Sequence, residues 1–298
     1  MSKITNKKIA IIGYGELGKA IHHILRKDLE AGVWDKMIRN DSTLEQALEG
    51  SGVVFLCVPS WCVREAIAGI IKFIDKKTVV VCLAKGIENE SLKTMDEILE
   101  DNLAKSQPMA ILSGPMLASE IVSDKRSFAV VGAKKKICFE KIKEVCDSSQ
   151  IFLEHSSDVR GVALAGVLKN IYAFGIGMAD GLELGSNFKG ALIKMAIKEM
   201  AEIEKFLGGK SETVLGFSGI ADLIATAFSE HSRNRRTGEI FAKTGDCCLE
   251  SEGSRSIEPI VKLLGKKSEK LAFLKNLNDA VSGKIGPKEV FERIFVNL

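Results

Sequence analysis

Short apolar runs alternate with helical patterns through the first half of the chain. Each run is four to six residues long, rich in β-branched residues and apolar on both faces, as a strand of a parallel sheet covered on both sides requires. The predicted strands are Lys8–Ile12, Val53–Val58, Thr78–Leu83, Met109–Leu112 and Phe128–Val131. The predicted helices between them are Gly18–Arg26, Thr43–Glu49, Val63–Ile74, Ser91–Leu103 and Lys136–Cys146. This alternation favours a doubly wound α/β sheet of the Rossmann type.

The pattern changes near residue 155, and beyond it we expect helices only. The Ser-Ser-Asp stretch at 156–158 offers N-caps for a long apolar helix. A later predicted helix, Ala191–Leu207, is followed by two glycines that signal its end. We therefore predict a Rossmann-type domain at 1–155 and an all-helical domain at 156–298.

Composition narrows the class of protein further. The chain has 298 residues, which allows one large domain or two ordinary ones, and its apolar content of 46% supports a substantial core. Its formal net charge of +3 is too small to indicate a nucleic-acid partner and mildly favours anionic ligands. The N-terminal apolar run ends too early for a signal peptide, and we expect no stretch to approach the length of a membrane span. The seven cysteines lack zinc-site spacing, so we expect no metal and predict incidental thiols in a reducing cytoplasm.

A glycine-rich stretch, GYGELG at residues 13–18, follows the first predicted strand and opens the first predicted helix. Gly13 permits a tight turn, Gly15 lets the backbone approach a pyrophosphate, and Gly18 lets the helix pack closely on the strand. The amides at the start of the helix would then face the phosphates. We predict a dinucleotide site here, with a glycine turn that binds nothing as the alternative.

The adenosine end of the dinucleotide has two kinds of candidate partner, one acid and two cations. Asp35 lies 22 residues after Gly13, near the spacing expected of an acid that accepts the ribose 2′-hydroxyl. Lys36 and Arg39 stand close by and could hold a 2′-phosphate instead. We favour NAD and leave NADP open. An ordinary loop carboxylate is the alternative reading of Asp35.

Two further predicted strands end in residues that could meet a ligand. Lys85 follows the strand TVVVCL, and Gly114 follows the strand that ends at Leu112. Ligands of open α/β sheets bind beyond the carboxyl ends of the strands, where both residues should lie. A solvated lysine and a structural turn are the alternatives.

Lys169 interrupts an apolar helical stretch, GVLKNIYAFGIGMADG at residues 166–181. Its helical neighbours at three, four and seven positions are all uncharged, so this is not a solvated face. We expect desolvation of a buried lysine to lower its pKa, which suits proton transfer near neutral pH. Asp222, a lone acid in SGIADLIATAF, could orient the ammonium group. A lysine that reaches the surface and an ordinary acid in the first turn of a helix are the alternatives.

The stretch SRNRR at residues 232–236 precedes another helical pattern. Ser232 is a plausible N-cap, and the next amides together with a guanidinium group would make a phosphate site. Basic residues oppose the dipole at a helix N-terminus, and a bound anion would compensate for that. A solvated, basic helix start is the alternative.

Taken together, these motifs resemble the bacterial-type NAD(P)-dependent glycerol-3-phosphate dehydrogenases. The matching stretches occur in family order over most of residues 9–253. They are GYGELG, VPSWCVREAI, LAKGIENESLKTMDEIL, LSGPMLASE, DVRGVALAGVLKNIYAFGIGMADGL, GFSGIADLIAT and SRNRR.

The resemblance implies a role for each matching residue. The catalytic residues would be Lys169 as general acid/base, with Asp222 and Lys85. The substrate site would be lined by Lys85, Gly114, Asn170, Asp222, Thr226, Ser232, Arg233 and Asn234. The cofactor site would be formed by Gly13, Gly15, Glu16, Leu17, Gly18, Asp35, Lys36, Lys85, Ala118, Arg233 and Glu252.

The chain also departs from the family pattern. Glu16 and Leu17 stand where the family usually has a serine and an aromatic residue, and Met116 replaces a small hydroxyl residue. The stretch between Asp35 and Val53 is shorter than usual, and the last forty-five or so residues match only loosely.

The implied reaction is the reversible reduction of dihydroxyacetone phosphate to sn-glycerol 3-phosphate, which feeds glycerophospholipid synthesis. Two alternatives stay open, namely a related two-domain dehydrogenase acting on another hydroxy acid or sugar phosphate, and a non-catalytic dinucleotide sensor. The implied partner is a small phosphorylated substrate, and a homodimer is left open.

Overall fold

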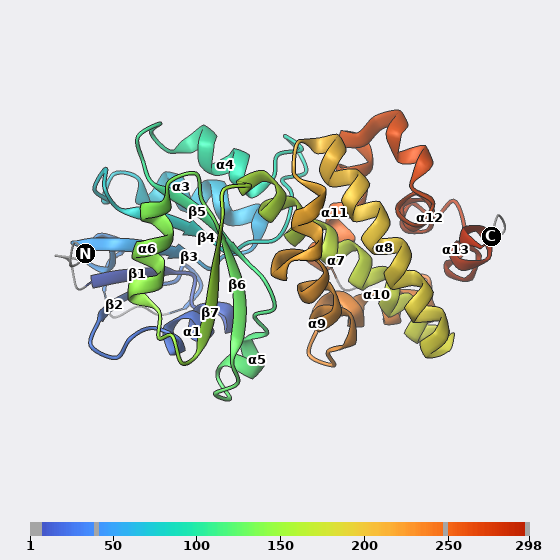
Figure 1. Ribbon diagram of the computed structural model, residues 1–298, viewed down its shortest axis with the longest axis horizontal. Helices are drawn as coiled ribbons and strands as arrows, with labels where there is room; N and C mark the ends of the chain where they lie inside the picture. Colours follow the sequence, from blue (N-terminus) through green and yellow to red (C-terminus); the bar gives the residue numbers. More distant parts are fainter. Residues whose placement is uncertain (1–7, 39–41, 247–249, 296–298) are drawn as a thin grey trace. The chain divides into compact units, whose positions relative to one another are not determined.

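The computed structural model describes residues 8–38, 42–246 and 250–295, and the chain divides into two compact units (Figure 1). The first unit comprises Met1–Lys85 and Lys93–Ala163, and the second comprises Gly86–Leu92 and Leu164–Leu298. The boundary that we predicted after residue 155 falls inside the last strand of the first unit, Ile151–Ser156. The roles that we predicted for the two domains stay predictions.

The first unit is built on a seven-stranded sheet with the order β2-β1-β3-β4-β5-β6-β7. All neighbouring strands are parallel except β5 and β6, which are antiparallel. The strands are β1 (Lys8–Ile12), β2 (Glu30–Trp34), β3 (Ser51–Leu56), β4 (Val79–Cys82), β5 (Met109–Ser113), β6 (Ser127–Gly132) and β7 (Ile151–Ser156). The expectation of a Rossmann-type sheet is confirmed.

Helices connect these strands. They are α1 (Glu16–His23), α2 (Leu44–Leu48), α3 (Val63–Ile70), α4 (Met95–Asn102), α5 (Ala118–Ile121) and α6 (Lys136–Val145), with a 3₁₀ turn η1 (Ser60–Cys62) before α3. Thr43 and Thr94 begin α2 and α4 with capping boxes, in which each threonine side chain accepts from the third helical amide. The predicted helices exist, and α1 and α3 end three or four residues earlier than their patterns indicated, whereas the other three predicted helices end one residue earlier.

The two edge strands, β2 and β7, were not predicted. The central strands are buried on both faces and appear in the sequence as continuous apolar runs. At the edges, however, β2 is half-exposed along most of its length, and β7 alternates between buried and exposed side chains. A search for runs that are apolar on both faces therefore finds the centre of the sheet and misses its edges.

The second unit consists of helices, with no strand among residues 86–92, 164–246 and 250–295. Its helices are α7 (Val159–Gly181, beginning in the first unit), α8 (Gly185–Leu207), α9 (Asp222–Phe228), α10 (Arg233–Thr244), α11 (Glu252–Leu264), α12 (Ala272–Val281) and α13 (Pro287–Ile294). Shorter turns are η2 (Ser211–Leu215), η3 (Phe217–Ala221) and η4 (Gly265–Lys270). In Figure 1, α8, α9, α10 and α11 lie around α7, and contacts from α7 to each of them agree with this view.

Helix α7 is buried along most of its length because other helices surround it. The Asp158 side chain caps its start by accepting from the Gly161 amide at 3.0 Å. By length and composition α7 could cross a membrane, so our expectation that no stretch approaches this length is wrong. Its most apolar window is entirely buried, as in the core helix of a soluble protein, so it is weak evidence for a membrane span.

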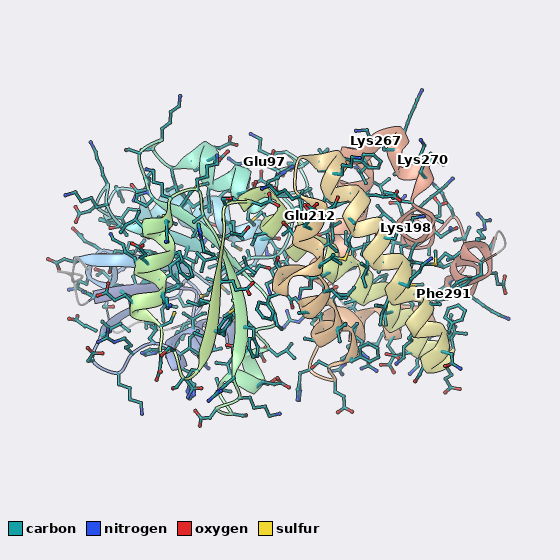
Figure 2. All side chains as sticks on the ribbon, viewed as in Figure 1. Glu97, Lys198, Glu212, Lys267, Lys270 and Phe291 are labelled. Carbon is teal, nitrogen blue, oxygen red and sulfur yellow. The ribbon has the colours of Figure 1, made fainter. Side chains whose placement is uncertain are left out.

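Two adjacent residues of helix α8, Lys198 and Glu199, differ in burial. Lys198 is exposed to solvent (Figure 2), whereas Glu199 is buried. The Glu199 carboxylate accepts from the Phe273 and Leu274 amides at 2.7 and 2.9 Å and from the Tyr172 hydroxyl at 2.9 Å. Burial raises the pKa of the Glu199 carboxyl above its ordinary value, and these three donors limit the rise. Glu199 thereby joins α7 and the start of α12 to α8 inside the second unit.

Candidate functional site

The glycine-rich loop of the first unit has the tight geometry that its sequence predicts. Gly13 has φ of +91°, and a Cβ there would lie 2.8 Å from the Cys57 carbonyl oxygen. A Cβ on Gly18 would overlap the Gly13 carbonyl oxygen. Both glycines are thus required by the turn itself, whether or not a ligand is bound.

Gly15 differs from its two neighbours in the loop. It is the N-cap of α1 with an ordinary φ of −69°, and a Cβ on it would meet no atom within 4 Å. The loop therefore leaves open space beside the first amides of α1, which is where a pyrophosphate would bind. Glu16 is exposed in the first turn, and Leu17 packs against the apolar core beneath the sheet. The loop fits a dinucleotide phosphate, and Glu16 adds a negative charge at its edge.

Asp35 follows β2 and is bound to the glycine-rich loop. Its carboxylate accepts from the Tyr14 amide at 2.6 Å and from the Met37 amide at 2.8 Å. The neighbouring Lys36 ammonium group lies 2.7 Å from the Glu65 carboxylate, whose hydrogen bond and charge raise the pKa of Lys36. Arg39, the second cation that we considered for a 2′-phosphate, lies outside the described residues.

Lys85 and Gly114 come together beyond the ends of β4 and β5. The Lys85 ammonium group donates to the Gly114 carbonyl oxygen at 2.8 Å. A Cβ on Gly114 would lie 2.5 Å from the Phe128 carbonyl oxygen, so no other residue fits there without a shift. Ala118, the first residue of α5, and Met116 pack at the border of the core nearby.

In the second unit, Lys169 is buried and has an anionic partner. Its side chain is 7% exposed, so the reading of a lysine that reaches the surface is wrong. The ammonium nitrogen lies 3.0 Å from an Asp222 carboxylate oxygen and 2.7 Å from the Thr226 hydroxyl oxygen. Thr226 in turn donates to Asp222 at 3.2 Å. Asp222 is the first residue of α9, so it is both a first-turn acid and the partner of the lysine.

Asn170 and Asn234 link three helices of the second unit. The Asn234 side chain donates to the Asn170 side-chain oxygen at 2.7 Å and accepts from the Gly253 amide at 2.8 Å. Gly253 was missed by sequence reasoning, and a Cβ on it would overlap the Asn170 carbonyl oxygen. The sequence signal that could have found it is Ser251, two residues earlier, which marks the N-terminus of α11. Glu252, the first residue of α11, is half-buried.

The start of α10 has the form that its sequence predicts. Ser232 is the N-cap, is 5% exposed, and accepts from the Arg235 amide at 3.2 Å. Arg233, the first helical residue, is exposed to solvent. The first-turn amides and this guanidinium group together form a place where an anion can bind.

Comparisons of the sequence and of the structure with known proteins find the same kind of protein. The profile of the NAD-dependent glycerol-3-phosphate dehydrogenase N-terminus matches residues 27–138, and that of the C-terminus matches residues 158–292. A glycerol-3-phosphate dehydrogenase (NAD(P)+) of Solidesulfovibrio magneticus is 32% identical over 87% of this chain and 89% of that protein. One of Chlorobium phaeobacteroides is 33% identical over 87% of this chain and 77% of that protein. The crystal structure of the Coxiella burnetii glycerol-3-phosphate dehydrogenase superposes with a TM-score of 0.88 at 25% identity, covering 97% of this chain and 99% of that one.

Proposed function

Because this chain belongs to the NAD-dependent glycerol-3-phosphate dehydrogenase family, we propose that it reversibly reduces dihydroxyacetone phosphate to sn-glycerol 3-phosphate. It is an oxidoreductase that uses NAD or NADP. The single observation that carries the proposal is the buried contact of Lys169 with Asp222 and Thr226. We propose that it acts in the cytoplasm and that its product feeds glycerophospholipid synthesis.

Lys169 is the proton donor of the proposed reaction. When a carbonyl carbon is reduced, its oxygen gains negative charge and needs a proton. A buried ammonium group stabilises that charge strongly because little water screens the interaction. Asp222 and Thr226 hold the nitrogen of Lys169 in place, so the ammonium group is already oriented for proton transfer.

The start of α10 holds the substrate phosphate. The amides of its first turn and the exposed Arg233 offer hydrogen bonds and positive charge to a phosphate dianion. Asn170 and Asn234 join this turn to α7, the helix that carries Lys169. The proton donor and the phosphate site are therefore held by one connected set of helices in the second unit.

The glycine-rich loop and the start of α1 would hold the pyrophosphate of the cofactor. When bound, the nicotinamide supplies the hydride. Lys85, held by the Gly114 carbonyl, provides a positive charge beyond the ends of β4 and β5. We also propose that Ala118 and Glu252 contact the cofactor, as the resemblance implies.

Replacing Gly15 with alanine tests whether the open space at the loop belongs to a cofactor. A Cβ there meets no protein atom, so the melting temperature should hardly change. The affinity for NADH, measured by fluorescence titration, should fall at least about tenfold if the phosphates approach that backbone. Gly190→Ala in α8, whose Cβ is equally unobstructed, is the control and should leave NADH binding unchanged. Unaltered NADH affinity in Gly15→Ala would contradict the cofactor site.

We propose that the cofactor is NAD rather than NADP. The Asp35 carboxylate, which follows β2 and accepts from the Tyr14 amide of the glycine-rich loop, would accept a hydrogen bond from the ribose 2′-hydroxyl and would repel a 2′-phosphate. Glu65 neutralises the adjacent Lys36. NADH should therefore give the higher kcat/KM in a dihydroxyacetone phosphate assay that compares NADH with NADPH.

The same assay tests the proposed reaction. Oxidation of NADH that depends on dihydroxyacetone phosphate supports it. Turnover only with another hydroxy acid or sugar phosphate would favour a related dehydrogenase, and cofactor binding without any turnover would favour a sensor. Either of these outcomes overturns the proposed function.

A further inference from the structure

We propose that Asp180 is a positioning residue for substrate phosphate, acting through Arg235 to hold the first turn of α10 in place. This inference rests on the proposed function, which assigns the first turn of α10 to the substrate phosphate. Neither Asp180 nor Arg235 is among the site residues inferred from the sequence.

Asp180 joins three helices through two charged contacts. It lies near the end of α7, and its carboxylate accepts from the Lys189 ammonium group on α8 and from the Arg235 Nε on α10, each at 2.7 Å. The three side chains are between 14% and 21% exposed, so solvent screens these contacts less than it screens a surface pair. The Lys189 ammonium group also lies 5.0 Å from the centre of the Phe228 ring.

Arg235 is held at both its backbone and its side chain. It is the third residue of α10, where its amide donates to the N-cap Ser232 while its guanidinium group binds Asp180. Arg233, two positions earlier, is exposed. Two of the three arginines of the SRNRR stretch thus have different tasks, because Arg233 faces solvent, where an anion can reach it, and Arg235 binds inward to the protein.

Glycines bring the backbones of α7 and α10 into direct contact beside this carboxylate. A Cβ on Gly177 would overlap the Arg235 carbonyl oxygen, and a Cβ on Gly238 would overlap the Phe174 carbonyl oxygen. A Cβ on Gly181 would lie 2.5 Å from the Glu239 carbonyl oxygen. Such close packing sets the distance between the helices, whereas the contact of Asp180 with Arg235 sets the position of the first turn of α10.

This arrangement has a consequence for catalysis, since α7 also carries Lys169. Asp180 lies about three turns further along that helix. Asp180 therefore fixes the phosphate-binding turn to the same rigid element that carries the proton donor. Loss of the Asp180 carboxylate should therefore weaken the binding of the substrate phosphate more than it slows the proton transfer.

The test is Asp180→Asn, which keeps the size of the side chain and removes its charge. KM for dihydroxyacetone phosphate should rise about tenfold while kcat at saturation changes less than about threefold, because uniform binding is lost rather than transition-state stabilisation. The affinity for inorganic phosphate, measured by calorimetry, should fall in parallel, and the affinity for NADH should not change. Glu258→Gln, which breaks an exposed pair with Lys262 on α11, is the matched control and should leave KM unchanged.

A double-mutant cycle shows whether Asp180 acts through Arg235. Arg235→Lys keeps the charge but loses the Nε contact, so it should raise KM by itself, and Asp180→Asn should then add little. If Asp180→Asn folds poorly, Arg235→Lys alone still tests the inference. A lower melting temperature with unchanged KM, or fully additive effects, would overturn the inference while leaving the proposed function intact. Absence of turnover by the unaltered protein would overturn both.

Discussion

Replacing Lys169 with alanine should lower kcat by about 10²–10⁴-fold, the usual contribution of a positioned acid or base. The carbonyl oxygen of the substrate would then gain its negative charge without a proton donor beside it. The affinity for NADH should stay within about twofold, because the loop assigned to the cofactor belongs to the first unit. Steady-state kinetics and NADH titration measure the two effects separately.

This variant needs a check on folding, because it leaves the Asp222 carboxylate buried without its ammonium partner. Breaking a buried pair from one side typically costs about 3–5 kcal/mol of stability. The double variant Lys169→Ala/Asp222→Ala removes both charges and should be more stable than Lys169→Ala but equally inactive. Lys198→Ala on the exposed face of α8 is the control for loss of a lysine and should retain activity. Substantial turnover in the folded double variant would contradict the role of Lys169.

Replacing Arg233 with alanine should raise KM for dihydroxyacetone phosphate by roughly 10- to 100-fold. A hydrogen bond to a charged group contributes about 1.5–3 kcal/mol, which corresponds to that range. Because Arg233 is exposed at the first position of α10, its removal should hardly change the melting temperature. Substrate-saturation curves at fixed NADH give the effect.

Arg236 supplies the matched control for Arg233. It is also exposed on α10, but its amide already donates to the Ser232 carbonyl, so it lies beyond the unpaired amides of the first turn. Arg236→Ala removes the same charge and should change KM by less than about threefold, because solvent and salt screen the interaction of an exposed charge with a phosphate that it does not contact. Equal increases in KM for both variants would show that only net charge matters, and the assigned phosphate site would then be wrong.

Prediction of the fold from sequence succeeded where burial leaves a continuous pattern. The central strands β1, β3 and β4 are covered on both faces, so each appears as an unbroken apolar run. The edge strands β2 and β7 lack that cover, and their mixed sequences resemble loops. The long helix α7 is ambiguous for a different reason. A helix that is buried on all sides is apolar all round, so its composition resembles that of a membrane span.

Within the candidate site, the sequence predicted the local geometry of residues whose conformation depends on their own sequence neighbours, while their roles stay proposals. The glycine-rich loop and the cap at Ser232 are local structures, so short motifs identify them. Apolar neighbours likewise identified Lys169 as a buried lysine. Lys36 was less predictable, because its pairing with Glu65, which lies on α3, has no local signal.

Short stretches of sequence were enough to predict the alternation of strands and helices, the tight turn at Gly13 and the burial of Lys169. These follow from periodicity and from backbone sterics, which act over a few residues. The tertiary structure was needed to choose between the two readings of Asp222, which does meet Lys169, and to show which arginine of SRNRR binds inward. Ion pairs and helix contacts join residues far apart in the chain, and their partners are chosen by packing, which no short stretch of sequence encodes.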